Sequence, residues 1–299
     1  MIEQRAPTNQ GSTMTRYRGR FAPSPTGPLH YGSLLAAVIS YLDAKSSNGD
    51  WLVRIEDIDG PRSQPNADKS ILACLSSHGL ISDFPTTYQS KHYARYETAL
   101  GKLQETGFTY RCPCSRMELA ENQNHSPRCI SQDIEGLDCA IKFRATNKSF
   151  YWQDGIYGAH EGVINRDFVL KRKDGLYAYQ LAVVVDDIEQ QITQVIRGAD
   201  LVESTPMQLA LYDALGFAPP IYSHFPLMTN DQGQKLSKQN LSPSVNNHFA
   251  VENIREIVRL LGIEPLSEQH CCKAILTDAS KRWSRSQLTS IDHFDELIR

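Results

Sequence analysis

The chain opens with an extended segment, a proline-stiffened loop and a helix, and this succession constrains its fold more than any other feature. Residues 18–22 are extended, and two prolines then prevent a helix from forming across the residues that follow. Apolar residues at helical spacing begin after Gly32, with Ser33 as the expected N-cap and Asn48-Gly49 as the stop.

The alternation of strand and helix continues beyond that first helix. Residues 51–55 have the apolar pattern of a buried strand, which ends in the acidic run at residues 56–59. Helices are expected at residues 68–77 and 92–105. Spacings of this kind are typical of βαβ units, so we expect an α/β fold built on a parallel sheet.

The pattern changes near Tyr110. Residues 111–173 contain clustered cysteines, short extended pieces at residues 140–144 and 167–171, and a turn at Asp174-Gly175. We expect this segment to be an insertion of a different kind within the parallel-sheet domain.

The α/β pattern returns after the insertion. The apolar run at residues 181–185 is expected to be a strand that resumes the sheet, and residues 207–215 a helix with Gly216 at its C′ position. After Lys238 an apolar stripe at helical spacing predicts a short helical appendage. A length of 299 residues suits one enlarged domain with small additions.

Composition and charge exclude several classes of protein. Lys and Arg total 31 and Asp and Glu total 34, so a net charge of −3 excludes a generally basic nucleic-acid coat but not a local basic patch. No apolar run approaches the roughly 18 residues that a membrane span needs. Residues 1–15 are polar, lack the apolar core of a secretory signal, and are expected to be a flexible leader. We therefore expect a cytoplasmic protein with reduced cysteines.

His30 and Gly32 lie in the loop directly before the first expected helix. The backbone N–H groups and the positive end of that helix would point at one place, which suits an anion such as a nucleotide phosphate. His30 can donate a hydrogen bond to a phosphate oxygen, and Gly32 lets a ligand approach the backbone. The alternative is a tight turn with a surface histidine.

A second basic motif, Lys235-Leu-Ser-Lys238-Gln, follows a turn rich in glycine, asparagine and aspartate. Two lysines three residues apart on a loop can hold a polyphosphate while its charge shifts in the transition state. A solvated lysine pair is the commoner arrangement, so the motif alone does not establish a site.

Three of the seven cysteines are bunched in the insertion, and their odd number favours metal ligation over a disulfide framework. Cys112, Cys114, His125 and Cys129 form a Cys-x-Cys and His-x₃-Cys set that suits one structural Zn²⁺ in a closed tetrahedral site. The alternative is three buried thiols and a surface histidine. Cys139 is a substitute ligand in this scheme. The other cysteines fit ordinary core or surface positions: Cys74, Cys271 and Cys272.

These observations divide the chain into four regions. They are a flexible leader at residues 1–15, an α/β domain at 16–110 and 179–245, an inserted zinc-bearing α+β subdomain at 111–178, and a helical C-terminal appendage at 246–299. The resemblance described next implies that the α/β domain is a Rossmann-type nucleotide-binding catalytic domain.

The two basic motifs, in this order and at this separation, resemble the HIGH-like and KMSKS-like signatures of class I aminoacyl-tRNA synthetases, here HYGS and KLSKQ. RFAPSPTGPLHYGSL, RIEDID with Arg62 behind it, and RGADL resemble the glutamyl branch, and the resemblance covers most of residues 18–240. Glutamyl-tRNA synthetases carry a large helical anticodon-binding region after the KMSKS-like loop, which this chain does not continue into. Its shorter build, with cysteines in the insertion, resembles the glutamyl-Q tRNA(Asp) synthetases.

The resemblance implies a glutamate site. Glu56 would accept hydrogen bonds from the α-ammonium of L-glutamate. Arg197 would bind the side-chain carboxylate bidentately, which favours glutamate over neutral glutamine. An internal ion pair is the alternative for both residues. The full set implied to bind glutamate is Arg20, Phe21, Ala22, Pro23, Ser24, Glu56, Tyr179 and Arg197.

The resemblance also implies an ATP site. His30 and Gly32 would form the adenylate cradle and Lys238 would contact ATP, so these three are the expected catalytic residues, with Lys235 added to the ATP-binding set. Mg²⁺ would accompany ATP, although the sequence offers no dedicated protein ligands for it. KLSKQ departs from KMSKS at its second and last positions, and related enzymes have a tyrosine where this chain has the better zinc ligand His125.

The implied reaction is an ATP-dependent, ligase-type transfer of glutamate, and we expect the protein to be a monomer. L-Glutamate and ATP would give glutamyl-adenylate, and a hydroxyl of the cyclopentenediol of queuosine in the anticodon of tRNA(Asp) would take the glutamate. Two alternatives remain open: a short ordinary glutamyl-tRNA synthetase that charges the tRNA 3′ end, and a catalytically silent paralogue that binds tRNA or nucleotide. RNA phosphates could meet basic residues at 171–173 or Lys281, Arg282 and Arg285, for which a solvated charged face is the alternative.

Overall fold

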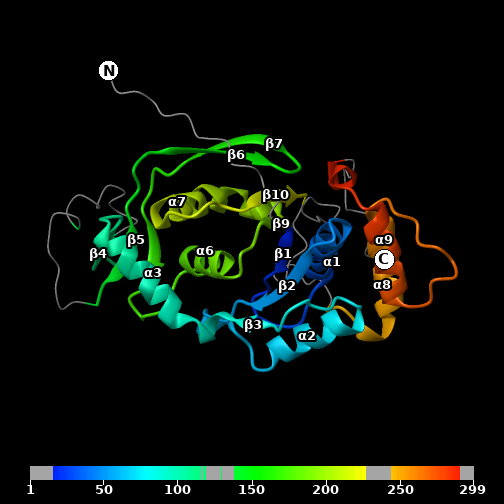
Figure 1. Ribbon diagram of the computed structural model, residues 1–299. Coiled ribbons are helices and arrows are strands. Elements are labelled where there is room, and N and C mark those ends of the chain that lie inside the picture. The colour runs from blue at the N-terminus through cyan, green and yellow to red at the C-terminus, as the bar shows by residue number, and fades with distance from the viewer. Residues whose placement is uncertain (1–15, 116, 119–128, 130–137, 227–243, 290–299) are drawn as a thin grey trace, which may run out of the picture.

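A parallel sheet forms the centre of the computed structural model, which describes residues 16–115, 117–118, 129, 138–226 and 244–289. Its strands are β1 (Arg18–Phe21), β2 (Asp50–Ile55), β3 (Thr87–Tyr88), β9 (Gln194–Gly198) and β10 (Ile221–Phe225). β1 pairs with β2, β2 with β3 and β9 with β10, each pair in parallel. The two groups meet where the backbone N–H of Thr193 donates to the carbonyl of Arg18 at 2.9 Å. The predicted parallel sheet is confirmed (Figure 1).

Helices lie around this sheet, as Figure 1 shows. The predicted helices at residues 68–77, 92–105 and 207–215 are confirmed, the last with Gly216 in the left-handed conformation at a φ of 79°. None of the described helices is both long enough and apolar enough to cross a membrane. The helices are α1 (Tyr31–Ser46), α2 (Ala67–Ser77), α3 (Tyr93–Glu105), α6 (Tyr179–Glu189), α7 (Thr205–Leu215), α8 (Ala250–Leu260) and α9 (Cys272–Arg282).

The first helix begins earlier than the sequence suggested. His30, and not Ser33, is the N-cap of α1: its backbone is extended, and its carbonyl accepts hydrogen bonds from the N–H groups of Ser33 and Leu34, each at 3.0 Å. Ser33 therefore lies inside the first helical turn, so its hydroxyl cannot serve as the cap. The helix ends at Ser46, and Asn48 follows with a φ of 51°, as the Asn-Gly stop predicted.

The prediction that residues 181–185 form a strand is wrong, because they lie within α6. All five side chains are buried in a core shared with α3 and α7. A helix enclosed on every side has no polar face, so its sequence shows no helical alternation, and a run of valines then has the composition of a buried strand. In Figure 1 α6 is seen almost end-on at the centre, below α7.

The insertion contains antiparallel structure, as its different pattern indicated. β4 (Thr109–Cys112) pairs with β5 (Ala140–Phe143), and β5 with β8 (Phe168–Lys171), so both predicted extended pieces are strands. The sequence did not reveal the hairpin of β6 (Ser149–Asp154) and β7 (Gly158–Val163), whose side chains are mostly exposed or half-buried. This hairpin extends over α7 towards β10 in Figure 1.

The C-terminal helices pack against the first helix. Residues of α8 and α9 share one apolar core with α1, which confirms the predicted helical stripe. Beyond α9, Trp283 Nε1 donates to Asp43 Oδ1 of α1 at 3.1 Å, and Arg285 contacts both oxygens of Asp43, at 2.9 and 2.7 Å. Tyr17 also donates to Asp43. We call these four residues the Asp43 cluster.

Candidate active site

The loop between β1 and α1 lies at the carboxyl end of the parallel strands, where open α/β sheets bind ligands. His30 forms a β-bridge with Ser244, and the N–H of Val245 donates to the carbonyl of Leu29 at 2.9 Å. Lys235 and Lys238 lie outside the described residues. The chain that follows them nevertheless returns directly to the loop that carries His30.

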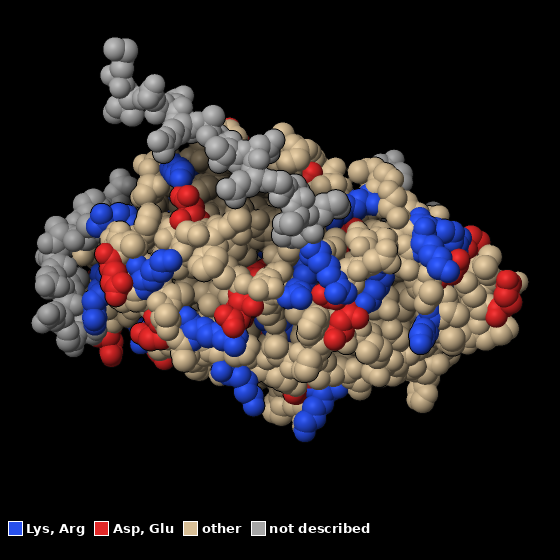
Figure 2. Space-filling model, in the orientation of Figure 1, with Lys and Arg blue, Asp and Glu red and all other residues tan. Residues whose placement is uncertain are grey.

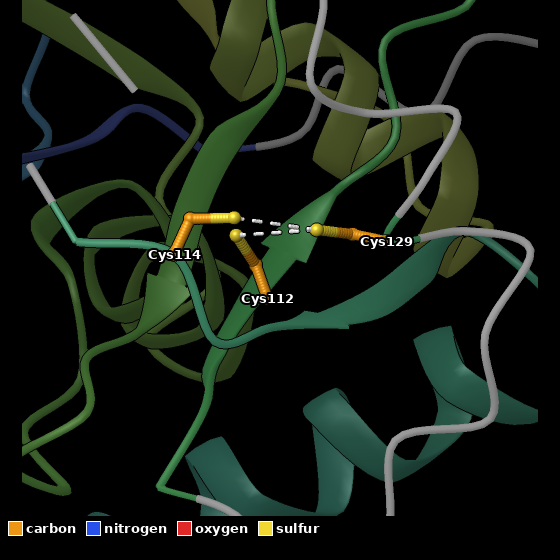
Figure 3. A group of neighbouring side chains, drawn as sticks. All are labelled: Cys112, Cys114 and Cys129. Carbon is orange, nitrogen blue, oxygen red and sulfur yellow. Dashed lines mark hydrogen bonds between the residues drawn. The ribbon is translucent and has the colours of Figure 1, made fainter. Parts of the chain in front are cut away.

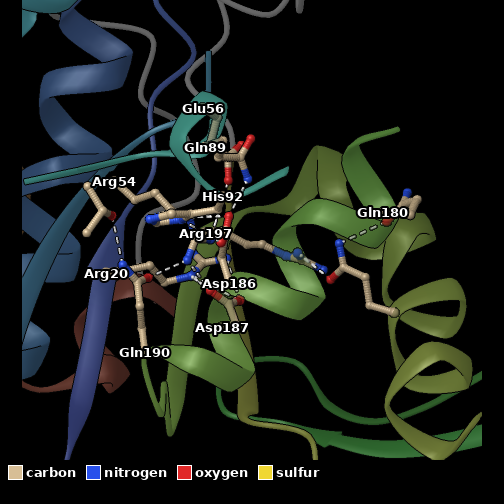
Figure 4. A network of polar contacts seen from close by, with 12 residues as sticks. Arg20, Arg54, Glu56, Gln89, His92, Gln180, Asp186, Asp187, Gln190 and Arg197 are labelled. Carbon is tan, nitrogen blue, oxygen red and sulfur yellow. Dashed lines mark hydrogen bonds and ion pairs between the residues drawn. The ribbon is translucent and has the colours of Figure 1, made fainter. Parts of the chain in front are cut away.

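A buried cluster of opposite charges lies between β1, β2 and α6, and its side chains converge in Figure 4. Asp187 is contacted by Arg20 Nε at 3.2 Å and by Arg54 Nη1 at 2.8 Å. Burial acts to raise the pKa of Asp187, but the two guanidinium groups hold it below its ordinary value. Asp187 is therefore a permanent anion that neutralises part of the positive charge.

Glu56 follows β2 directly and joins this cluster. Its Oε1 lies 3.4 Å from Arg54 Nη2, and its backbone N–H donates to the carbonyl of Pro23 at 3.0 Å. Burial raises the pKa of Glu56 to about 7, against the lowering effect of Arg54 and Arg20. The alternative of an internal ion pair thus describes Glu56 in this structure. A nearby ammonium group would lower the pKa of this carboxyl group, because the positive charge favours its ionised form.

Arg54, Asp186 and Asp187 are polar residues of the site that sequence reasoning missed. Asp186 accepts hydrogen bonds from Gln89 at 2.9 Å and Tyr96 at 2.7 Å. The available signal was an acidic pair at the end of a buried apolar run. Two carboxylates near the C-terminus of a helix oppose its dipole, so they need cationic partners from elsewhere in the fold.

Arg197 on β9 has a different environment from Arg20 and Arg54. It is 6% exposed, and its guanidinium lies over the ring of Tyr222, 4.8 Å from the centroid. No carboxylate of the described residues lies within ion-pair distance of Arg197, so the internal ion pair is absent there. Its hydrogen bonds reach neutral acceptors: His224 Nε2 at 3.0 Å, Gln208 Oε1 at 2.8 Å, Thr205 Oγ1 at 2.9 Å and the Leu201 carbonyl at 3.2 Å.

The other residues expected to bind glutamate take varied positions. Tyr179 is the first residue of α6, and burial raises its pKa, with Glu56 adding to the effect and Arg197 and Arg20 opposing it. The ring of Phe21 is buried and stacks on Trp51, 6.5 Å between centroids. Ala22 and Pro23 are half-buried and Ser24 is exposed. The fold thus brings the side chains of Arg20, Glu56, Tyr179 and Arg197 to one place.

This group of four side chains, which we call the amino-acid site, suits one kind of ligand. A buried cation with only neutral partners attracts a carboxylate, and a buried carboxylate of raised pKa attracts an ammonium group. A small molecule that carries both groups would complete the charges.

Cys112, Cys114 and Cys129 form a cluster in the insertion, with sulfur atoms within 4.8 Å of one another (Figure 3). Cys129 Sγ lies 3.5 Å from Cys114 Sγ and 4.0 Å from Cys112 Sγ. Tetrahedral Zn²⁺ with Zn–S bonds of about 2.3 Å places its sulfur ligands about 3.8 Å apart, so the three thiols fit a metal. His125 lies outside the described residues, and Cys139 is half-buried.

Three of the basic residues considered for RNA have acidic partners within the protein. Lys171 contacts Glu97 at 2.7 Å, Arg172 contacts Asp174 at 2.5 Å, and Arg285 belongs to the Asp43 cluster. On the face drawn in Figure 2, Lys and Arg side chains are interspersed with Asp and Glu. Lys171 and Arg172 therefore match the alternative of a charged face, whereas Arg285 has a structural role in the Asp43 cluster.

Comparisons with known proteins give consistent matches. The family model "tRNA synthetases class I (E and Q), catalytic domain" matches residues 16–296. A glutamyl-Q tRNA(Asp) synthetase of Idiomarina loihiensis is 45% identical over 275 residues, which cover 90% of this chain and 97% of that relative. The protein of the same name from Xanthomonas campestris pv. campestris is 44% identical over 289 residues, 95% of this chain and 97% of the relative.

A solved structure has the same fold. The glutamate tRNA ligase from Elizabethkingia meningosepticum, crystallised in complex with its amino acid, matches with a TM-score of 0.78 and 25% identity. The match covers 92% of this chain and 66% of that ligase.

Proposed function

Because this chain belongs to the family of class I tRNA synthetase catalytic domains for glutamate and glutamine, we propose that it activates L-glutamate with ATP and transfers it to queuosine in tRNA(Asp). The name shared by relatives that match over nearly their whole length supports the acceptor. The observation that supports the amino acid is Arg197, a buried cation whose hydrogen-bond partners among the described residues are all neutral.

Glutamate would bind with its two charged ends separated. Glu56 accepts from the α-ammonium, and Arg197 takes the side-chain carboxylate, which glutamine lacks. Tyr179, Arg20 and the residues that follow β1 complete the binding site. These roles rest on the resemblance of the motifs and on the convergence of the side chains.

The first step joins glutamate to the nucleotide. An oxygen of the α-carboxylate attacks the α-phosphorus of ATP, the bond to the bridging oxygen breaks, and pyrophosphate leaves. His30, Gly32 and the start of α1 hold phosphate oxygens, while Lys235 and Lys238 neutralise the pyrophosphate side. Mg²⁺ bound with ATP supplies further charge neutralisation.

The second step transfers the acyl group to RNA. A hydroxyl oxygen of the queuosine cyclopentenediol attacks the carbonyl carbon of glutamyl-adenylate, the mixed-anhydride bond breaks, and AMP leaves with the hydroxyl proton passing to solvent. The protein thus works as an ATP-dependent, tRNA-modifying ligase. We place it in the cytoplasm as a monomer, with the four regions of the chain as divided above.

The cysteine cluster is proposed to hold one structural Zn²⁺, with Cys112, Cys114 and Cys129 as thiolate ligands and His125 as the fourth. The sulfur geometry supports this assignment. Metal analysis of chelator-washed protein should return about one zinc per chain. A result of no metal would contradict the site.

Charging of the tRNA 3′ end is the competing function, because the glutamate tRNA ligase shares the fold. The test is transfer of labelled glutamate by purified protein to bulk tRNA from two strains, one that makes queuosine and one that cannot. We expect label only on the queuosine-containing pool. Equal label on both pools would establish 3′-end charging instead, and no label on either would favour a silent paralogue.

A further inference from the structure

Two hydrogen bonds connect Asp154 on the β6–β7 hairpin to Arg197 in the amino-acid site. Asp154 Oδ2 lies 2.6 Å from His224 Nδ1, and the opposite ring nitrogen, His224 Nε2, accepts from Arg197 Nε at 3.0 Å. His224 has no exposed surface, and Asp154 is 2% exposed. The insertion therefore reaches the amino-acid site through one buried imidazole.

The two oxygens of Asp154 have separate partners. Oδ1 accepts from the backbone N–H groups of Ile156 at 3.0 Å, Tyr157 at 3.1 Å and His224 at 3.2 Å. Among the described residues, the hydrogen-bond partner of Oδ2 is the imidazole alone. Three N–H donors orient the carboxylate, so Oδ2 presents a lone pair to His224 in one direction.

This arrangement selects one tautomer of His224. Burial lowers the pKa of His224, and the positive charge of Arg197 and the nearby His160 act in the same direction, against the raising effect of Asp154. Burial tends to raise the pKa of Asp154, but the hydrogen bonds from His224 and the backbone lower it to about 2. A neutral imidazole beside a carboxylate carries its proton on Nδ1, which leaves the Nε2 lone pair for the N–H of Arg197.

The imidazole completes the set of groups that orient the guanidinium. Gln208 accepts from Nη1 of Arg197 and is itself held by a hydrogen bond to Gln180 at 3.0 Å, while Thr205 and Leu201 accept from Nη2. Four of the five guanidinium N–H groups thus have a neutral acceptor, which leaves one N–H on Nη1 for a carboxylate and not the two that the expected bidentate contact needs. These acceptors set the plane of the group without cancelling its charge.

We propose that Asp154 and His224 are positioning residues that hold Arg197 in the orientation that binds the side-chain carboxylate of the substrate. The proposal rests on the proposed function, since it assigns to the hairpin of the insertion a part in recognising that carboxylate. Neither residue touches the substrate in this scheme.

Asp154→Asn tests the proposal with little change of shape. Because the three backbone N–H donors require an oxygen at the Oδ1 position, the amide nitrogen takes the place of Oδ2 and donates to His224 Nδ1. The imidazole then carries its proton on Nε2, directed at the N–H of Arg197. We expect the KM for glutamate to rise about tenfold or more, with the KM for ATP unchanged.

Asp43→Asn is the matched control, because it also removes one charge from a buried carboxylate held by several donors. It should lower stability and leave the KM for glutamate as in the wild type. If both variants shift the KM for glutamate equally, the effect is general loosening and the proposal is wrong.

His224→Gln provides a second route if Asp154→Asn does not fold. It should also raise the KM for glutamate and leave the KM for ATP unchanged. The KM of the double variant for glutamate should not exceed that of the more impaired single variant, because both changes break one chain of contacts. Additive effects or an unchanged KM would overturn the proposal. A wild-type protein that activates no glutamate would instead contradict the proposed function itself.

Discussion

The Asp43 cluster and the amino-acid site each contain a hydrogen-bonded arginine, but the arginine is structural in the first and available to a ligand in the second. In the Asp43 cluster one buried carboxylate receives the guanidinium of Arg285 on both oxygens, so the two charges cancel. In the amino-acid site Arg197 is equally well hydrogen-bonded, yet each of its acceptors in the described part of the chain is neutral. Hydrogen bonding alone therefore does not distinguish a structural arginine from a binding arginine, whereas the charge of its partners does.

The cluster around Asp187 lies between these two cases. Arg20 and Arg54 have acidic partners, but Glu56, the third carboxylate besides Asp186 and Asp187, is kept near half-ionisation by burial. In this cluster the arginines have acidic partners without a ligand, but the ionisation of Glu56 can still change when a ligand binds.

The largest expected effect is a loss of stability when the Asp43 cluster is broken. Asp43→Ala should lower the free energy of unfolding by about 3 kcal/mol, because it leaves Arg285 and the indole N–H of Trp283 without their acceptor. Urea denaturation measures this loss. A stability equal to that of the wild type would show that the cluster does not attach the C-terminal helices.

Arg197→Ala should lower catalytic efficiency more than it lowers stability. We expect kcat/KM for glutamate to fall by about 100-fold or more, because the substrate carboxylate loses a buried, charged partner. Adenylate formation measures it, with Arg197→Lys as the control that keeps the charge but loses the donor to His224. If Arg197→Ala costs only stability, Arg197 is structural and the contrast with Arg285 fails.

The intermediate cluster should make the protein sensitive to pH. The pKa of Glu56 is about 7 when folded against an ordinary value of 4.5, so the folded chain binds more protons between these values. Stability should therefore fall as pH rises from 4.5 to about 7. Saturating glutamate should flatten the decline, since its ammonium favours the ionised carboxylate.

The same titration predicts the pH dependence of substrate binding. The KM for glutamate should rise as pH falls below about 7, approaching about tenfold per pH unit, and should be level in Glu56→Gln. Kinetics across this range with ATP saturating provide the measurement. A wild-type profile as level as that of the variant would contradict the role of Glu56.

Arg285→Lys should give the smallest effect. Lysine keeps the charge beside Asp43 but loses the two-pronged contact, so we expect a loss of about 1 kcal/mol in unfolding and unchanged kinetics. A loss as large as that of Asp43→Ala would mean that geometry, and not charge, dominates the cluster.

Local signals predicted much of the fold. The strand, proline loop and helix at the start of the chain, the parallel pairing and the helix ends depend on residues close in sequence, and they are confirmed apart from the cap of α1. Residues 181–185 were assigned wrongly because their environment comes from α3 and α7, which the local pattern does not contain.

Only some residues of the site could be predicted, because the local sequence does not show which distant residues the fold brings together. Motifs indicated Arg20, Glu56, Tyr179 and Arg197, and the fold brings them together. Arg54 lies in the RIEDID motif, but the motif gave it no role of its own. Asp154 and His224 belong to no motif, and their importance follows from a contact between residues that are 70 positions apart. Only the folded structure joins them.

The contact between Arg18 and Thr193 has a consequence for how the protein matures during synthesis. These residues are 175 positions apart, and β10, which carries His224, follows later still. Because closing so long a loop is entropically costly and must await the emergence of its second half, the sheet cannot be completed while the N-terminal half alone has left the ribosome. The amino-acid site, which needs Arg197 of β9, therefore forms only after the second half of the chain has emerged, and the edge of β1 that faces Thr193 stays unpaired until then.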